Sequence, residues 1–233
     1  MRRQLRDGAL AGLAGGAALA LVLLLAGEAS IGQAITLERR AHPGAAQGET
    51  FSRGTQQAGG AVAAIVGGVA LGAIFAVAWV ALRRHLRPAG STPTAHWSAA
   101  VALAGIAFLT VNLVPFLKYP ANPPGVGDPS TIGRRTGLYL LMLAWSVVTT
   151  AAAWLAARWM GGRGWPNHLR LPAVAGIYAT LVVIALAALP GSPDSVTAPA
   201  TLVWHFRLTS LAGTAAFWAV CGTVFGWLTL SRR

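Results

Sequence analysis

The sequence predicts an all-α integral membrane protein with six transmembrane helices in one bundle and short loops between them. Of its 233 residues, 55% are hydrophobic and only 10% are charged. The charges are gathered in short clusters instead of alternating along amphipathic faces, which is typical of a membrane protein. In addition, six runs lack Asp, Glu, Lys, Arg and His. Each run is long enough to cross a hydrocarbon core, which takes about 20 apolar residues.

These runs give the expected elements in chain order. They are Gly8–Gly27, Ala58–Leu82, Trp97–Leu117, Thr136–Ala157, Leu171–Leu189 and Leu208–Leu230. Each should be helical, because a backbone in lipid must satisfy its own hydrogen bonds. The connecting segments are too short to hold a separate soluble domain, so residues 1–233 are expected to form a single polytopic membrane domain.

Small residues recur at every fourth position in three of the runs. They are Gly8, Gly12 and Gly16 in the first, Ala64, Gly68 and Gly72 in the second, and Gly222 and Gly226 in the last. Such ridges allow helices to approach closely, so they predict packing seams. A hinge or a sliding surface is the alternative interpretation.

The third run contains a polar residue close to a proline. Asn112 lies three residues before Pro115, which lacks a backbone donor and should kink or end the helix. Asn112 is therefore expected either to make an interhelical hydrogen bond or to face a pathway as a polar ligand.

The basic residues predict the orientation of the chain. With the N-terminus in the cytoplasm, cytoplasmic segments hold eleven Lys and Arg and the opposite face holds seven. This bias favours a multi-pass protein of the cell membrane with both termini cytoplasmic. Because the charges meet headgroups at span ends, the net charge of +12 does not indicate nucleic-acid binding. The start "MRRQLRDG" also resembles a cleavable signal, but five further spans favour its retention as an anchor.

Most of the reactive side chains fall in the three loops predicted on the outer face, at Glu28–Gln57, Lys118–Arg135 and Pro190–Arg207. These loops hold five of the six acids and two of the five histidines. Carboxylate and imidazole groups are ligands for a divalent first-row cation such as Co²⁺. The alternative is that the acids are only solvated, since no close HxxxH or HExxH spacing occurs. The absence of a Ser/His/Asp set, a GK[ST] loop and paired carboxylates on one helix argues against an enzyme.

The second loop, within "FLKYPANPPGVGDPSTIGRRTGLYL" (Phe116–Leu140), should be stiff. Its four prolines fix backbone φ angles, and glycines supply turns between them. Asp128 is expected to cap or approach the fourth helix. If the loop dips into the bundle, Lys118, Asp128 and an arginine could pair there, where an unpaired charge would be costly.

Four stretches of the chain resemble a known family. "PFLKYPANPPGVGDPSTIGRRT" (Pro115–Thr136) resembles the signature of the CbtA family, the larger membrane subunit of a predicted cobalt transporter linked to cobalamin synthesis. "GEASIGQAITLERR" (Gly27–Arg40), "FSRGTQQ" (Phe51–Gln57) and "LVWHFRLTSL" (Leu202–Leu211) resemble the end of its first span, the entry to its second and the approach to its last. The resemblance thus covers essentially the whole chain.

The resemblance implies a permease subunit for cobalt uptake in the lipid bilayer, with Co²⁺ as transported ion and no permanently bound cofactor. It also implies a small one-span partner, CbtB, which carries a histidine motif that this chain lacks; a homo-oligomer is a further possibility. The alternative function is a non-transporting membrane scaffold or assembly factor for that metal-binding partner. The chain departs from relatives at His42–Thr50, which keeps one histidine, and at His205, where an arginine is expected.

The resemblance also carries over individual residues. The matched positions are Lys118, Tyr119, Asn122, Asp128, Arg134 and Arg135 in the central motif, Arg53 and Gln56 before the second span, and Arg207 before the last. Because arginine does not coordinate a cation, the cationic members are expected to lock loops onto helix ends through charged hydrogen bonds. The candidate metal ligands are Glu28, Glu38, Asp128 and His205.

Overall fold

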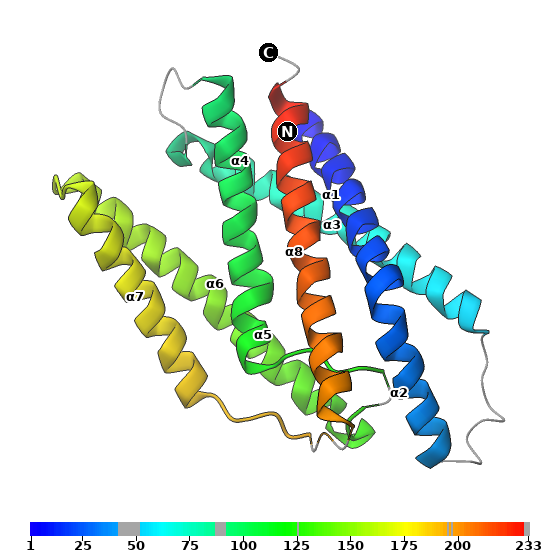
Figure 1. Cartoon of the computed structure of the whole chain (residues 1–233). Helices are drawn as coiled ribbons and strands as arrows, with labels where there is room; N and C mark the ends of the chain where they lie inside the picture. Colours follow the sequence, from blue (N-terminus) through cyan, green and yellow to red (C-terminus); the bar gives the residue numbers. More distant parts are fainter. Residues whose placement is uncertain (42–51, 87–91, 125, 195, 197, 231–233) are drawn as a thin grey trace. The chain divides into compact units, whose positions relative to one another are not determined.

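The computed structural model describes residues 1–41, 52–86, 92–124, 126–194, 196 and 198–230, and these residues form helices and connecting segments without a strand. The longer α-helices are α1 (Arg2–Val22), α2 (Glu28–Ala41), α3 (Arg53–Leu86), α4 (Pro93–Phe108), α6 (Ile132–Gly162), α7 (Asn167–Ala188) and α8 (Ala200–Leu230) (Figure 1). The remaining elements are α5 (Val114–Lys118), the π-helical turns η1 (Leu23–Gly27) and η3 (Leu109–Leu113), and the 3₁₀ turn η4 (Pro129–Thr131). The predicted all-α fold class is confirmed.

Six continuous helical segments among the described residues are long and apolar enough to cross a membrane. They are Arg2–Leu37, Arg53–Leu86, Pro93–Lys118, Pro129–Gly162, Asn167–Ala188 and Ala200–Leu230. Each contains most of one of the six apolar runs. The chain is therefore a multi-pass membrane protein.

The helices extend beyond the apolar runs, and this corrects the prediction for the first outer loop. Most of the described part of Glu28–Gln57 is helical, because α2 continues from η1 to Ala41 and α3 begins at Arg53. A helix need not end where the hydrocarbon ends, since its backbone hydrogen bonds are internal in either medium. Residues 42–51, which include His42, lie outside the described residues.

The chain divides into two compact units. Unit 1 comprises Met1–Phe108, Asn122–Val126 and Ala198–Arg233, and unit 2 comprises Leu109–Ala121 and Gly127–Thr197. The single membrane domain expected for residues 1–233 stays a prediction, and each unit is described by itself.

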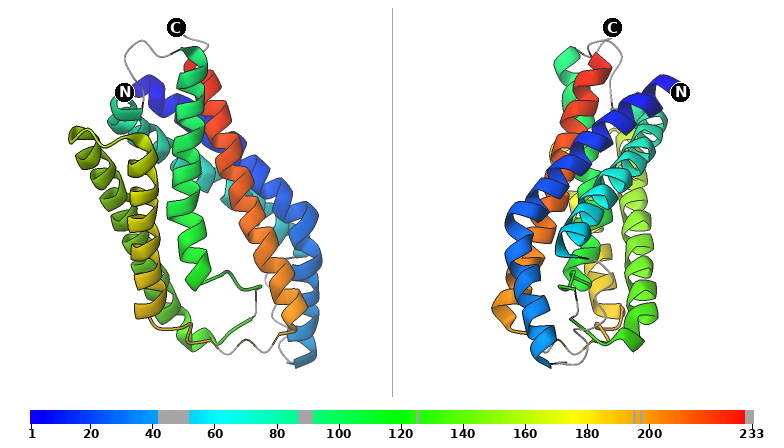
Figure 2. Two further views of the ribbon diagram at one scale, coloured as in Figure 1. Left: turned by 60° about the vertical axis from the view of Figure 1, so that its left-hand side comes forward. Right: turned by 90° about the vertical axis from the view of Figure 1, so that its right-hand side faces the viewer.

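Unit 1 is built around α1, which packs against α3 and α8. The right-hand view of Figure 2 shows α1 (blue) and α3 (cyan) next to each other. A Cβ added at Gly16 would lie 2.6 Å from the carbonyl oxygen of Ala64, and Gly8 and Gly12 meet Gly72 and Gly68 in the same way. Glycine is required here because the two backbones touch. The predicted packing seam is confirmed.

Within unit 1, α8 also packs against α4, and glycines of α8 allow this close approach. A Cβ at Gly222 would lie 2.5 Å from the Cβ of Ala104, and one at Gly226 would lie 2.8 Å from the Trp97 ring. Aromatic side chains also pack in this core. The rings of Phe75 and Phe225 meet edge to face, with their centroids 5.2 Å apart. The core of unit 1 therefore combines backbone contact with aromatic packing.

Unit 2 is the antiparallel pair α6 and α7, with η3 and α5 packed against it. Its core contains Val114, Met142, Val182 and Ala185. Of the two outcomes expected at Pro115, a kink or an end of the helix, the end does not occur there: the chain adopts the π turn η3, which contains Asn112, and continues as α5 to Lys118. Because Pro115 has no N–H, the carbonyl of Val111 loses its α-helical donor. The Tyr139 hydroxyl donates to that carbonyl at 3.4 Å.

Candidate functional site

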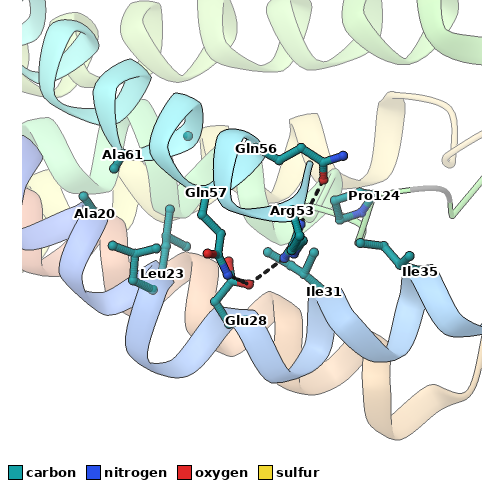
Figure 3. Close-up of a pocket in the computed structure, with 12 residues that line it drawn as sticks. Ala20, Leu23, Glu28, Ile31, Ile35, Arg53, Gln56, Gln57, Ala61 and Pro124 are labelled. Carbon is teal, nitrogen blue, oxygen red and sulfur yellow. Dashed lines mark hydrogen bonds and ion pairs between the residues drawn. The ribbon is translucent and has the colours of Figure 1, made fainter. Parts of the chain in front are cut away.

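A pocket with a volume of about 490 Å³ lies in unit 1, between the α1–η1–α2 segment and the start of α3 (Figure 3). Its lining residues are Ala20, Leu23, Leu24, Glu28, Ile31, Ile35, Arg53, Gln56, Gln57, Gly60, Ala61 and Pro124. Most of the lining is apolar, and the polar groups gather at Glu28. This residue follows η1 directly, and π-helical turns are frequent at functional sites.

The polar part of the pocket is a hydrogen-bonded group centred on the Glu28 carboxylate (Figure 3). Glu28 Oε2 accepts from Arg53 Nη2 at 2.6 Å and from Gln57 Nε2 at 2.8 Å. Arg53 Nη1 also donates to Gln56 Oε1 at 3.2 Å. The three α3 residues can act together because positions i, i+3 and i+4 share one helix face.

The Glu28–Arg53 ion pair remains open to its surroundings. The Glu28 side chain is 27% exposed and the Arg53 side chain is 36% exposed. A carboxylate in this position can exchange one cationic partner for another without first unfolding its neighbours.

The proline-rich piece of the central motif also contributes to unit 1. Pro124 lines the pocket, and the Val126 N–H donates to the Pro123 carbonyl at 3.1 Å, which forms a tight turn. Arg207 of α8 donates from Nη2 to Asn122 Oδ1 at 2.8 Å. This charged hydrogen bond fixes the turn on α8 and thereby places Pro124 at the pocket wall.

In unit 2, Lys118 and Tyr119 at the start of the central motif form hydrogen bonds with the C-terminal end of α7 and the proline that follows it. Lys118 Nζ donates to the carbonyl of Leu186 at 2.7 Å. In a longer helix that carbonyl would accept from residue 190, but Pro190 has no N–H. The Tyr119 hydroxyl donates to the Pro190 carbonyl at 2.7 Å, and burial raises the pKa of this tyrosine. Lys118 therefore satisfies a carbonyl that has lost its backbone donor, and Tyr119 binds the carbonyl of the proline that follows α7.

Asp128 caps the turn that leads into α6. It is the N-cap of η4, and its Oδ1 accepts from the Ser130 N–H at 2.8 Å. Hydrogen bonds from the Ser130 side chain and backbone, with a contribution from the charge of Arg135, hold the pKa of Asp128 below its ordinary value. The sequence predicts that Asp128 caps or approaches the fourth helix. Asp128 caps η4, which leads directly into α6, whereas the N-cap of α6 itself is Thr131.

Arg135 pairs with Asp194, a residue of the third connection. Arg135 Nη1 lies 2.6 Å from Asp194 Oδ2, and the Asp194 side chain is fully buried. Thr131 Oγ1 donates to the other carboxylate oxygen. The sequence predicts that an arginine of the motif pairs with Asp128. This prediction is wrong, because Asp128 caps η4 and the partner of Arg135 is Asp194.

Gly127 makes room for this buried pair. Its φ of +111° is a conformation that residues with a Cβ rarely adopt. A Cβ there would also lie 2.7 Å from Asp194 Oδ2 and 3.0 Å from Arg135 Nη1. The glycine between the motif's prolines therefore allows the backbone to cover the ion pair.

The other predicted site residues are not gathered into one centre. Arg134 and His205 are exposed, Asn112 lies in η3, and the side chain of Glu38 falls outside the described part of α2. Across the described ranges, no three His, Cys, Asp or Glu side chains lie close enough together to hold a metal ion. Metal binding by Glu28, Glu38, Asp128 and His205 stays a prediction.

Sequence reasoning missed four residues that complete these clusters. They are Gln57 beside Glu28, and Gly127, Thr131 and Asp194 around Arg135. Gln57 carries a usable signal, since it lies one helical turn after Arg53 in "RGTQQ". Asp194 has a weaker signal: it is one of only six acids and occurs between prolines and serines in "PGSPDS".

Comparison with known proteins identifies the family. A family model described as "Probable cobalt transporter subunit (CbtA)" matches residues 1–230, so the chain belongs to the CbtA family. The resemblance recognised in the sequence is confirmed. No curated protein and no solved structure matches the chain.

Proposed function

We propose that this member of the CbtA family is the permease subunit of a cobalt-uptake system of the cell membrane, with both termini in the cytoplasm. The family description, the six apolar helices and the excess of basic residues on the N-terminal side support this function. The observation that carries the proposal is the pocket at Glu28. It offers a partly exposed carboxylate and two amides at the polar end of a membrane-spanning helix pair.

In the proposed mechanism Co²⁺ is the transported substrate and first binds at Glu28. The ion replaces the Arg53 guanidinium, so that the carboxylate remains neutralised in its mostly apolar surroundings. Carboxylate and amide oxygens from Glu28, Gln56 and Gln57 complete a loose oxygen shell with retained water. Such a shell suits a site of entry, because an ion that is to be transported must also leave.

Inward movement of the ion can draw on the membrane potential. A potential of 100 mV is worth about 2.3 kcal/mol per elementary charge, hence about twice that for a divalent ion. The sequence contains no phosphate-binding GK[ST] loop that would point to ATP. The proposed subunit therefore needs no permanently bound cofactor of its own.

The description as a subunit supports assembly with other chains. We expect a small one-span, CbtB-like partner that supplies a histidine motif, and homo-oligomerisation within the bilayer is compatible with this arrangement. The partner would deliver or receive the ion, since nitrogen ligands are scarce in the described residues of this chain.

One observation favours the second candidate function, a non-transporting scaffold or assembly factor. Three cationic residues carried over from the family resemblance, Lys118, Arg135 and Arg207, are engaged in contacts within the chain that fix its connections. A scaffold would need this stiffness and no ion pathway.

Measurement of cobalt uptake separates the two functions. The chain is expressed with and without its small partner in a cobalt-starved host, and accumulation of radioactive cobalt is followed over time. The proposal expects uptake that falls by about tenfold in Glu28→Gln, because a charged contact to the ion is lost, while copurification of the partner is unchanged. Absence of uptake with either combination, together with metal-independent copurification, would support the scaffold instead.

A further inference from the structure

The turn between α6 and α7 in unit 2 is basic and has no acidic neighbour in the sequence. The stretch "RWMGGRGWPNHLR" (Arg158–Arg170) contains three arginines, two tryptophans and a histidine. No Asp or Glu occurs between Asp128 and Asp194. Both of those acids belong to the opposite end of the α6–α7 pair, where Asp128 caps η4 and Asp194 pairs with Arg135.

Two of the arginines stack on tryptophan rings. The guanidinium of Arg163 lies over the Trp159 ring at 3.7 Å, and that of Arg158 lies over the Trp154 ring at 5.0 Å. Each pair is spaced by four residues, so both partners share one face at the end of α6. Stacking occupies one face of a guanidinium and leaves its N–H groups at the edge available to an anion.

The third arginine reaches across the turn. Arg170 Nη2 donates to Asn167 Oδ1 at 2.8 Å, and its Nη1 lies against Gly161, where a Cβ would be only 2.6 Å away. Among the described residues, neither Arg163 nor Arg170 forms an ion pair. Because Arg170 Nη1 lies beside Gly161, only two residues before Arg163, both of these unpaired charges belong to the same turn.

These arginines are not needed to close the end of α6. The Trp165 N–H donates to the Met160 carbonyl and the Gly164 N–H donates to the Gly161 carbonyl, both at 3.1 Å. With Gly164 at φ +76°, this is the Schellman arrangement that satisfies the carbonyls of a helix C-terminus from its own backbone. A role in capping therefore does not account for the arginines.

Apolar side chains surround the same turn. Trp159 is 54% exposed, Trp165 41%, Leu169 52% and Leu171 65%. A free phosphate ion would gain nothing from these groups. A phospholipid would gain from them, because its acyl chains can cover the leucines while its phosphate meets the guanidinium groups.

We propose that the α6–α7 turn is a binding site for one anionic phospholipid. Arg163 and Arg170 bind the phosphodiester, Trp159 and Trp165 lie at the level of the headgroup, and the acyl chains pack beside Leu169 and Leu171. The site shares no residue with the Glu28 pocket, and its function is to anchor unit 2 in a membrane that contains anionic lipid.

Native mass spectrometry of the purified full-length chain tests this site. The protein is exchanged into detergent with equal amounts of phosphatidylglycerol and phosphatidylcholine, and the retained lipids are counted. The wild type is expected to retain phosphatidylglycerol preferentially, and Arg163→Gln/Arg170→Gln to bind it about thirtyfold more weakly. Arg163→Lys should bind with intermediate affinity, because it keeps the charge but loses the planar contact with Trp159.

A matched pair at another helix end provides the control. Arg83→Gln/Arg84→Gln removes the same charge from exposed positions of α3 and should leave phosphatidylglycerol retention unchanged. Helical circular dichroism and a single gel-filtration peak must be retained by every variant that is compared. Equal loss of binding in the two double variants, or no preference over phosphatidylcholine, would overturn the proposal. Competition by glycerol phosphate as effective as that by phosphatidylglycerol would instead identify a site for free phosphate esters.

Discussion

Two ion pairs among the described residues, one in each unit, have the same length and different settings. Glu28–Arg53 in unit 1 and Arg135–Asp194 in unit 2 both measure 2.6 Å. The Glu28 side chain is 27% exposed at the edge of a pocket, whereas that of Asp194 is fully buried beneath Gly127. An exposed pair contributes little to stability and can change partners, whereas a buried pair is costly to break. Distance alone therefore does not distinguish an exchangeable site from a structural one.

The largest expected effect comes from breaking the buried pair. Asp194→Asn leaves the Arg135 guanidinium beside a neutral amide and should destabilise the protein by about 3 kcal/mol. The melting temperature of the purified protein in detergent measures this loss, with Glu28→Gln as the matched carboxylate-to-amide change in unit 1. Equal melting temperatures for the two variants would show that burial does not separate the two pairs.

The next effect concerns the backbone that covers the buried pair. Gly127→Ala forces a Cβ into a positive-φ conformation and against Asp194, which should cost about 2 kcal/mol. Gly137→Ala is the control, because no atom lies within 4 Å of a Cβ placed at that position in α6. This control should be neutral or slightly stabilising, since alanine favours a helix. A neutral Gly127→Ala would mean that the pair needs no such cover.

Breaking the exposed Glu28–Arg53 pair should change transport more than it changes stability. Removal of the competing cation by Arg53→Gln frees Glu28 and should lower the KM for cobalt uptake by roughly three- to tenfold. Its stability should change by less than about 1 kcal/mol, as for other exposed pairs. Arg83→Gln, a change at an exposed arginine near the other end of α3, is the control in the same uptake assay. A raised KM in Arg53→Gln would show that Arg53 assists ion binding and does not compete with it.

Local features of both units could be predicted from the sequence. The six spans could be predicted because an apolar run of sufficient length has few alternatives in a membrane. The Gly8–Gly16 seam could be predicted because its spacing is local to one helix. The Asp128 cap follows from the neighbouring Pro129 and Ser130 for the same reason.

The partners of the charged residues could not be predicted in this way. Arg135 lies close to Asp128 in the sequence, yet it pairs with Asp194 because the connection after α7 folds back to the start of α6. Glu28 meets Arg53 only because the helix continues through η1 into α2, beyond the end of the apolar run. Such pairings depend on where helices end and on how connections return, and hydrophobicity determines neither.

The smallest expected effect is the pH dependence contributed by Asp128, an exposed acid that precedes Arg135 of the buried pair in the sequence. Hydrogen bonds from Ser130 lower the pKa of Asp128 from 3.8 in the folded state, so the ionised carboxylate stabilises the fold above that value. This contribution is lost as the pH falls from about 4 through the lower folded-state pKa. In melting curves between pH 6 and pH 3, Asp128→Asn should therefore lose less stability on acidification than the wild type. Ser130→Ala, which removes the side-chain donor, should lie between them, and identical pH profiles for all three proteins would show that the cap does not depend on charge.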